Sequence, residues 1–329
     1  MGVNLNGPLL AIDAGNSKTD VAVVGTDGRV LGSARGGGFQ PPVVGVEAAV
    51  DGLAEAVGRA WLEAGGADSP PTFSHVSACL ANADLAVEEQ ELEKALSARR
   101  WSRSIRVRND TFAILRAGID EPRGVAVVCG AGINCVGMVP DGRTARFPAI
   151  GKISGDWGGG SGLAEEALWF AARAEDGRGE PTALARELPA HFGLPSMYAL
   201  IEALHLGRIA FERRHELTPV LFRTSAEGDA IARSLVHRLA EEVVALSTVA
   251  LGRLGLLAEE VPVMLGGSVL AARHPELDAR ITELLALKAP KAVIGVVTAP
   301  PVLGAALFAL DEWGDGLRAA ARLREHYGA

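Results

Sequence analysis

Apolar and polar residues alternate in short runs through the first part of the chain, and polar or glycine-rich turns separate these runs. The pattern predicts β-strands at about 8–14, 20–26 and 29–35. Apolar residues then recur at helical spacing, which predicts an amphipathic helix whose buried face carries Val46, Val50, Leu53, Ala54, Val57 and Trp61. Further strands at 73–80 and 105–108, each followed by a helix, indicate a mixed α/β sheet.

The second part of the chain begins with a segment that repeats the first. Residues 125–139 predict a strand, an Ala-Gly turn and a strand, and Asp141-Gly142-Arg143 follows them as Asp27-Gly28-Arg29 follows the first hairpin. The interval from turn glycine to aspartate is 12 positions in the first copy (27 minus 15) and 9 in the second (141 minus 132). The repeat predicts two related lobes that face one cleft, with a chance similarity of two apolar hairpins as the alternative.

The pattern divides the chain into two predicted domains. We expect residues 1–112 to form an N-terminal lobe, completed by a C-terminal helix at about 305–329. Residues 113–304 would form a C-terminal lobe with a helical insertion at about 163–258. No low-complexity linker is visible, which favours a shared hinge over a flexible tether.

The composition is that of an ordinary globular protein, with 48% hydrophobic and 22% charged residues. A formal net charge of −8 argues against general affinity for nucleic acid or for an anionic membrane. The uncharged stretch 292–310 has the length of a membrane span, but Pro300 and Pro301 divide it into halves that match a buried strand and a buried helix. We therefore expect neither a nucleic-acid partner nor a membrane partner.

The three cysteines, Cys79, Cys129 and Cys135, have neither the spacing of a zinc site nor that of a disulfide framework. Their apolar surroundings are typical of buried free thiols in a reducing compartment. The N-terminus lacks the basic segment and apolar core of a signal peptide. These features predict a cytoplasmic protein.

The first hairpin turn carries groups that suit a metal-bound polyphosphate. Gly15 permits close backbone approach, and the turn's amides and the hydroxyls of Ser17 and Thr19 can donate to phosphate oxygens. Lys18 adds a positive charge, and Asp13 can hold Mg2+ through water. A plain hairpin with a polar turn is the alternative. The second turn, residues 130–132, would supply further backbone donors or be a purely structural turn.

Asp110 is the candidate catalytic base. It ends a predicted strand beside Asn109, where a carboxylate can accept a proton from an attacking hydroxyl, although a helix N-cap role explains it equally well. Asp156 lies in the glycine-rich run 155–162 and could hold a substrate hydroxyl or a water on Mg2+, with a surface loop as the alternative. The turn 266–268 follows a buried strand and leaves room for a nucleotide against its backbone.

In this order, the motifs resemble those of the BadF/BadG/BcrA/BcrD-type ATPases, and within that group those of the N-acetylglucosamine kinase branch. They are IDAGNSKT at 12–19, ND at 109–110, CGAGIN at 129–134, GDWG at 155–158, LGGS at 265–268 and PVLGAA at 301–306. The resemblance implies a two-lobed actin-like ATPase fold, which is a duplicated ribonuclease H-like α/β fold with a mixed sheet in each lobe. It also implies an amino-sugar kinase of the N-acetylglucosamine or glucosamine class, with ATP and Mg2+ as cofactors, acting as a homodimer.

The resemblance further implies roles for individual residues. The first phosphate loop would contain Asp13, Gly15, Asn16, Ser17, Lys18 and Thr19, and the second Gly130, Ala131 and Gly132. Gly266, Gly267 and Ser268 would face adenosine, and Asp110 would be the general base. The residues that line the sugar would be Gln40, Asn109, Asp110, Asn134, Ile150, Gly151 and Asp156.

This chain departs from the family pattern at several of these positions. Asn16 replaces a loop glycine, Ala131 a phosphate-loop threonine and Ile133 a serine. Ile150 replaces a tryptophan near the sugar, and Trp157 replaces an acidic residue. The departures leave the identity of the sugar open.

Two further functions stay open from the sequence. Some family members are ATP-driven electron-transfer activators, which hold an iron–sulfur cluster on exposed cysteines, whereas Cys129 and Cys135 lie in the second hairpin. A nucleotide-gated regulatory module without sugar phosphorylation is the other alternative, favoured by Asn16 and Ala131 and opposed by Asp110. Pantothenate kinases of the same superfold share an Asp-x-Gly-Asn turn, but the later motifs fit the amino-sugar branch better.

Overall fold

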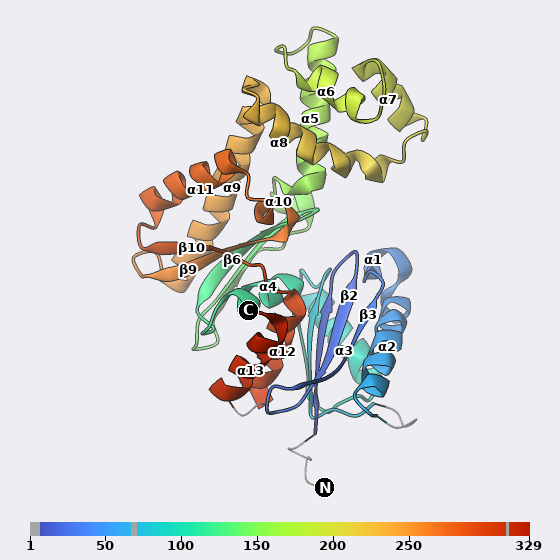
Figure 1. The fold of residues 1–329 in the computed structure, drawn as a ribbon, viewed down its shortest axis with the longest axis vertical. Helices are drawn as coiled ribbons and strands as arrows, with labels where there is room; N and C mark the ends of the chain where they lie inside the picture. The colour runs from blue at the N-terminus through green and yellow to red at the C-terminus, as the bar shows by residue number, and fades with distance from the viewer. Residues whose placement is uncertain (1–6, 67–70, 314–315) are drawn as a thin grey trace. The chain divides into compact units, whose positions relative to one another are not determined.

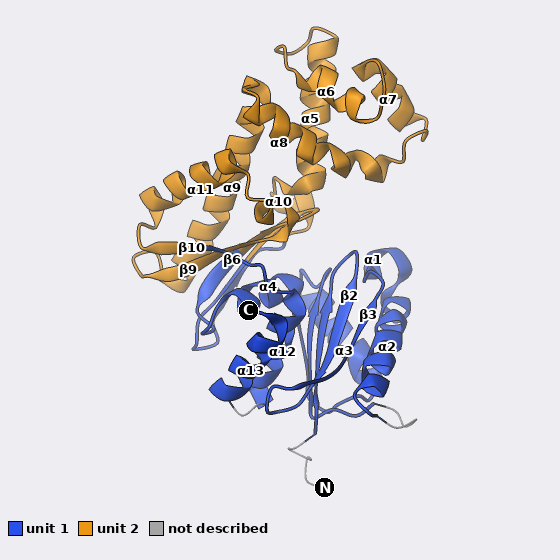
Figure 2. Cartoon of the chain, viewed as in Figure 1, with its two compact units in different colours: residues 1–126, 136–148, 295–329 blue, residues 127–135, 149–294 orange. Residues whose placement is uncertain are grey.

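The computed structural model of the chain describes residues 7–66, 71–313 and 316–329, which form two compact units. One unit comprises residues 1–126, 136–148 and 295–329, and the other comprises residues 127–135 and 149–294 (Figure 2). We refer to them as unit 1 and unit 2. Each of two five-stranded sheets has helices beside it (Figure 1).

The first sheet lies in unit 1 and has the strand order β3-β2-β1-β4-β5. Its strands are β1 (Leu9–Ala14), β2 (Thr19–Val24), β3 (Val30–Gly36), β4 (His75–Leu80) and β5 (Ile105–Asn109). Strands β1, β2 and β3 pair antiparallel, whereas β1, β4 and β5 pair parallel. The helices of unit 1 are α1 (Pro41–Val44), α2 (Val46–Glu63), α3 (Ala86–Ala98), α4 (Asp110–Gly118), α12 (Pro301–Trp313) and α13 (Leu317–Tyr327).

Helices cover both faces of the first sheet, so its central strands are buried along their whole length. Every residue of β1, β2 and β4 is buried. Helices α2 and α3 pack on one face, and α12 and α4 pack together on the other (Figure 1). Helix α12 crosses α4 at Gly304, where a Cβ atom would collide with the backbone of Ala113. The glycine thus permits the close approach of the two helices.

The second sheet has the strand order β10-β9-β6-β7-β8. Its strands are β6 (Gly124–Cys129), β7 (Ile133–Met138), β8 (Thr144–Arg146), β9 (Val261–Gly266) and β10 (Ala292–Val296). The helical segments of unit 2 are η1 (Gly151–Ser154), α5 (Gly159–Glu175), α6 (Leu184–His191), α7 (Met197–His205), η2 (Phe211–Leu217), α8 (Thr218–Ala226), α9 (Ala230–Leu254), α10 (Gly267–Ala271) and α11 (Pro275–Lys288).

The two sheets share one topology, which supports the predicted internal repeat. Read from β8, the second sheet has the order β8-β7-β6-β9-β10, in which each strand corresponds to a strand of the first sheet in chain order. The two Asp-Gly-Arg turns also agree in detail, because the carboxylate of Asp27 and that of Asp141 each accept from the amide and the Nε of the arginine two residues on. The predicted duplicated α/β fold is confirmed.

The structure differs from the predicted elements in a few places. Strand β10 is only partly buried, because it is an edge strand of its sheet, so the prediction of a buried strand there was wrong. The short helix α1 follows the glycine run 36–38, where no helix was predicted. The predicted helix at 305–329 contains parts of α12 and α13, and residues 314–315 lie outside the described residues. Within the described ranges, every helix is too short or too polar to cross a membrane.

Candidate active site

Three parallel strands of unit 1 end at one edge of the first sheet, and each end carries polar side chains. Asp13 lies at the end of β1, and Asn109 and Asp110 follow each other at the end of β5. Strand β4 lies between them and leads into Asn82 and Asp84. Because the carboxyl ends of adjacent parallel strands meet, this edge gathers three carboxylates.

The first hairpin turn is closed by its own backbone. The amide of Gly15 donates to the carbonyl of Lys18 at 2.9 Å, and the carbonyl of Gly15 accepts from the amide of Phe39 at 2.9 Å. Among the described residues, the amides of Asn16, Ser17 and Lys18 donate no hydrogen bond, and all three side chains are exposed. The turn therefore has the free donors that an anionic group requires.

Two amide side chains hold the first turn from outside. The Nε2 of Gln40 donates to the carbonyl of Asn16 at 2.9 Å. The Nδ2 of Asn82 donates to the Oδ1 of Asn16 at 3.0 Å and to the carbonyl of Phe39 at 3.1 Å. Asn82 has a positive φ of 60°, which asparagine tolerates better than most residues. Gln40, predicted to line the sugar, thus also orders the phosphate-type turn, and Asn82 was not predicted.

Lys18 and Asp13 belong to one electrostatic cluster. The Nζ of Lys18 lies 2.9 Å from the Oδ2 of Asp20, which Arg35 also contacts. Asp13 is 7% exposed. Burial, and then the charges of Asp110 and Asp20, raise the pKa of Asp13 to about 8, against the opposing charge of Lys18. The charge of Lys18 thus offsets only part of the effect of burial on this carboxyl group.

Asp110 is half-buried and occupies the first position of α4. The N-cap of this helix is Asn109, whose side chain accepts from the amide of Thr111 at 3.0 Å. Burial raises the pKa of Asp110 to about 6, although hydrogen bonds from the amides of Thr111 and Asp110 oppose the shift. Because Asn109 caps the helix, capping does not account for Asp110. A carboxylate with a pKa near neutrality is suited to proton transfer.

The second turn, in unit 2, is fixed by the start of α5. The carbonyls of Gly130 and Ala131 accept from the amides of Gly160 and Ser161 at 2.7 and 3.1 Å. The amide of Gly130 donates to the carbonyl of Gly132 at 2.9 Å, and the amides of Ala131 and Gly132 donate no hydrogen bond within the described part of the chain. Two backbone donors at an exposed tip thus remain available for an anion.

Gly267 also packs against the second hairpin. Its φ is +81°, and a Cβ atom there would lie 2.5 Å from the carbonyl carbon of Cys129. The close approach of its own chain is therefore sufficient reason for a glycine at this position. Gly266 ends β9, and Ser268 follows in α10, so all three residues predicted to face adenosine lie beside the predicted second phosphate turn.

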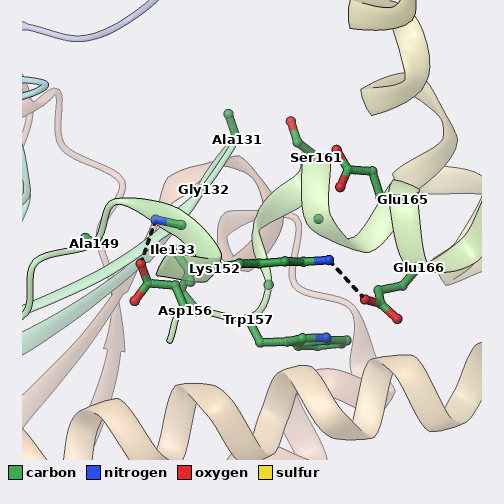
Figure 3. A pocket seen from close by; sticks show the side chains of 13 residues that line it. Ala131, Gly132, Ile133, Ala149, Lys152, Asp156, Trp157, Ser161, Glu165 and Glu166 are labelled. Atoms are coloured by element: carbon green, nitrogen blue, oxygen red, sulfur yellow. Dashed lines mark hydrogen bonds and ion pairs between the residues drawn. The ribbon is translucent and has the colours of Figure 1, made fainter. Parts of the chain in front are cut away.

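A pocket of about 260 Å³ in unit 2 brings several predicted residues together (Figure 3). Ala131 and Gly132 of the second turn line it together with Gly151 and Asp156. The Oδ2 of Asp156 accepts from the amide of Gly151 at 2.9 Å and from the hydroxyl of Ser154 at 2.6 Å. Asp156 therefore orders this loop as well as lining the pocket.

The same pocket contains residues that sequence reasoning missed. Lys152 extends beside Trp157 towards Glu166, and its Nζ lies 3.9 Å from the Oε1 of that carboxylate (Figure 3). The guanidinium of Arg238 lies 4.2 Å from the ring centroid of Trp157. The only sequence signal for Glu166 was its position in the helix that follows the glycine-rich run.

Not every predicted residue lines this pocket. Neither Ile150 nor Asn134 lines the pocket. The side chain of Ile150 is exposed. The Oδ1 of Asn134 accepts from the amide of Cys135 at 2.7 Å. In unit 1, the residues that the structure places at one sheet edge or its adjoining turn are Asp13, Gly15, Asn16, Ser17, Lys18, Thr19, Gln40, Asn109 and Asp110.

The duplicated mixed sheets, with phosphate-type turns after equivalent strands, define the class of actin-like two-lobed α/β proteins. The chain belongs to the BadF/BadG/BcrA/BcrD ATPase family, whose profile matches residues 10–309. The resemblance to this family is therefore confirmed.

Known relatives agree with this assignment. The chain is 26% identical over 232 residues to the N-acetylmuramic acid/N-acetylglucosamine kinase of Clostridium acetobutylicum, covering 70% of this chain and 76% of that one. It is 27% identical over 209 residues to the N-acetyl-D-glucosamine kinase of Dictyostelium discoideum, and the match covers 62% of this chain and 65% of that one.

Solved structures share the fold. A Chromobacterium violaceum protein named as a proposed N-acetylglucosamine kinase superimposes with a TM-score of 0.70 at 21% identity, over 93% of this chain and 99% of that one. A ROK family glucokinase from Streptomyces griseus, in complex with glucose and AMPPNP, gives a TM-score of 0.55 at 16% identity. The match covers 93% of this chain and 99% of that one. These similarities establish the fold of the chain.

Proposed function

We propose that this protein is an ATP-dependent kinase that phosphorylates a hydroxyl group of an amino sugar of the N-acetylglucosamine or glucosamine class. The observation that carries the proposal is the half-buried Asp110 after β5, across β4 from the buried Asp13 of β1, in a chain of an ATPase family. The names of the two relatives support the sugar class.

Asp110 would act as the general base. Its pKa of about 6 leaves the carboxylate ionised at neutral pH but still basic enough to take the proton of a sugar hydroxyl as that oxygen attacks phosphorus. The amides of Thr111 and Asp110 hold the carboxylate, so it is oriented before the sugar binds. Positioning of this kind, with charge stabilisation, accounts for most of the catalysis in phosphoryl transfer.

The two turns would hold the phosphates of ATP. In unit 1 the donors are the amides of residues 16–18, the hydroxyls of Ser17 and Thr19, and the ammonium group of Lys18. Lys18 would exchange its contact with Asp20 for a phosphate oxygen. In unit 2 the donors are the amides of Ala131 and Gly132. Backbone donors explain how Ala131 can replace a threonine without loss of the turn's function.

The residues present fit Mg2+. Asp13 supplies hard carboxylate oxygens, and a cation beside it would offset the burial and the neighbouring charges that raise its pKa. Asp13 would hold the ion through water. When bound, Mg2+ would neutralise charge on the transferring phosphoryl group. Of this arrangement, the chain itself supplies the carboxyl group of Asp13.

The pocket of unit 2 would contact the sugar. Asp156 and Gly151 line it together with the second turn, so a sugar bound there would lie next to the phosphate site. The Oδ1 of Asp156 is the acceptor that remains for a sugar hydroxyl, since its Oδ2 holds the loop. Trp157 lines the same pocket (Figure 3).

The experiment that tests the proposal is ADP release with Mg2+-ATP over a panel of glucosamine, N-acetylglucosamine, N-acetylmannosamine, glucose and pantothenate. We expect release well above the sugar-free rate with one amino sugar. Release with pantothenate alone would replace the proposed substrate class, and ATP binding without sugar-dependent release would support a regulatory module instead.

The structure disfavours an iron–sulfur activator. Cys79, Cys129 and Cys135 are the only cysteines of the chain and all are buried in strands. Burial raises the pKa of the Cys129 thiol to about 12 and those of the other two thiols as well. Cluster ligation requires accessible thiolates.

The homodimer and the cytoplasmic location stay predictions. Size-exclusion chromatography with light scattering tests the first, and fractionation of cells tests the second. We also expect the chain to bind neither nucleic acid nor membranes, as its net charge of −8 indicates.

A further inference from the structure

The geometry points to Asp84 as a positioning residue that orients the catalytic carboxylate of Asp110 through the side chain of Asn109. This inference rests on the proposed function, and it assigns a role to a residue that the sequence patterns did not single out. Asp84, Asn109 and Asp110 all lie in unit 1, at the edge where β4 and β5 end.

The side-chain amide of Asn109 is held at both ends. Its Nδ2 donates to the Oδ1 of Asp84 at 2.8 Å, and its Oδ1 accepts from the amide of Thr111 at 3.0 Å. A carboxylate can only accept, so Asp84 requires the NH2 group of Asn109 to face it. The amide oxygen must then face the start of α4. Asp84 thus selects one of the two orientations that an asparagine side chain can adopt.

The orientation of Asn109 sets the position of Asp110. Asn109 is 2% exposed and caps α4, and Asp110 is the first residue of that helix. The amides of Thr111 and Asp110 hydrogen bond to the carboxylate of Asp110. The amide of Thr111 therefore interacts with two groups: the side chain of Asn109, which caps the helix, and the carboxylate of Asp110, which is the proposed base. A reversed Asn109 amide would place NH2 against this donor and displace the first turn of α4.

Two side chains, those of Glu88 and Arg146, contact the backbone around Asp84. The carboxylate of Glu88 accepts from the amides of Asp84 and Leu85 at 3.0 and 2.8 Å. The Nη2 of Arg146 donates to the carbonyls of Ala83 and Asp84 at 3.0 and 2.8 Å. The residue is thus fixed by α3 on one side and by β8 on the other.

The charges of Asp84 and Asp110 also interact. Burial, and then the charge of Asp110, raise the pKa of Asp84 to about 7, with a further contribution from Glu88. Arg146 and the hydrogen bond from Asn109 oppose this rise. The hydrogen bond from Asn109 thus favours the ionised form of Asp84.

The test compares three variants in steady-state kinetics with the sugar that the wild type phosphorylates. Asp84→Ala removes the acceptor, and we expect kcat to fall by about 10- to 100-fold with little change in KM for ATP. Asp84→Asn keeps an oxygen that can accept from Asn109, and it should recover most of that loss. Glu88→Ala is the matched control, because it loosens the same segment without touching Asn109, and its kcat should stay within about twofold of the wild type.

Equal losses of kcat in Asp84→Ala and Glu88→Ala would overturn the inference, because they would indicate a structural role for the segment. Losses in Asp84→Asn as large as those in Asp84→Ala would overturn it too. A second measurement combines Asp84→Ala with Asn109→Ala and follows urea unfolding. We expect losses of stability that are not additive, as for two partners of one hydrogen bond.

The two proposals fail in different ways. If the wild type phosphorylates no sugar, the proposed function fails and the catalytic part of this inference falls with it. The unfolding cycle then decides the remaining part by itself: additive losses overturn the link between Asp84 and Asn109, and coupled losses retain it.

Discussion

Gly159 leaves no space for a side chain beside Gly132. A Cβ atom at position 159 would lie 2.5 Å from the Cα of Gly132, and the φ of Gly159 is +74°. The start of α5 therefore packs directly on the second turn, and its next two amides hold the carbonyls of that turn. The glycine-rich run 158–160 is explained by this packing as much as by any ligand.

We expect Gly159→Ala to distort the second turn and to weaken ATP binding. Backbone strain and the steric clash should raise KM for ATP by about tenfold or more. Gly52→Ala is the control, because a Cβ atom there meets nothing within 4 Å on α2. An unchanged KM for ATP in Gly159→Ala would show that the turn does not contribute to the nucleotide site.

Asp110→Asn should remove the general base. We expect kcat to fall by about 10²- to 10⁴-fold, with ATP binding retained. Because only ionised Asp110 can take a proton and its pKa is raised to about 6, kcat/KM of the wild type should decline as pH falls through about 6. A pH–rate profile from pH 5 to 9 checks this, and a flat profile across pH 6 would contradict the assignment.

Asp13→Asn should stabilise the free protein while it impairs catalysis. The raised pKa of Asp13 means that the folded state retains a proton that the unfolded chain has lost above about pH 4. Stability from this group is therefore present at low pH and is lost as pH rises through about 8. The variant avoids this loss and should be more stable than the wild type at pH 8 by more than about 1 kcal/mol.

Thermal unfolding at pH 4 and pH 8, with and without Mg2+-ATP, measures this effect. The difference between Asp13→Asn and the wild type should vanish at low pH. Mg2+-ATP should stabilise the wild type more than the variant, since the variant lacks the carboxylate. A variant less stable than the wild type at pH 8 would contradict this account of Asp13.

Glu312→Gln should destabilise unit 1. The Oε2 of Glu312 lies 2.9 Å from the Nε2 of the buried His75, and Arg108 contacts the other oxygen. Burial opposes ionisation, but His75 and Arg108 outweigh it and lower the pKa of Glu312 to about 2. We expect a loss of about 1–3 kcal/mol at pH 7 in urea unfolding.

The pH dependence of that loss provides an internal control. A depressed pKa contributes stability above the ordinary pKa of glutamate, and this stability is lost as pH falls towards about 2. The wild type and Glu312→Gln should therefore converge in acid. An equal difference at pH 3 and pH 7 would show that the charge of Glu312 is not what holds α12 to the sheet.

The sequence predicted the strand ends of unit 1 only in part. Asp13 was found because it ends an apolar run, and Asp110 because it follows a predicted strand beside Asn109; their strands lie on either side of β4. Asn82 and Asp84 follow the strand between them, but only a helix was predicted after that strand and neither residue was assigned a role. The order of strands in a sheet depends on tertiary packing, which local apolar periodicity does not contain.

The pocket of unit 2 shows a second limit of sequence reasoning. Asp156 and Gly151 were predicted from their glycine-rich surroundings, and both line the pocket. Glu166 reaches the same pocket from α5, but a glutamate in an amphipathic helix usually indicates a solvated face. Its position depends on how α5 leaves the second turn, which is set by the contact of Gly159 with Gly132.

The most direct test of the proposed activity follows the γ-phosphoryl group itself. γ-Labelled ATP is incubated with Mg2+ and each amino sugar, using the wild type and Asp110→Asn, and the label is traced by chromatography and mass spectrometry. We predict that the wild type transfers label to one amino sugar as a sugar phosphate and that Asp110→Asn does not. Label released only as inorganic phosphate, or equal transfer by the two proteins, would contradict a sugar kinase with Asp110 as its base.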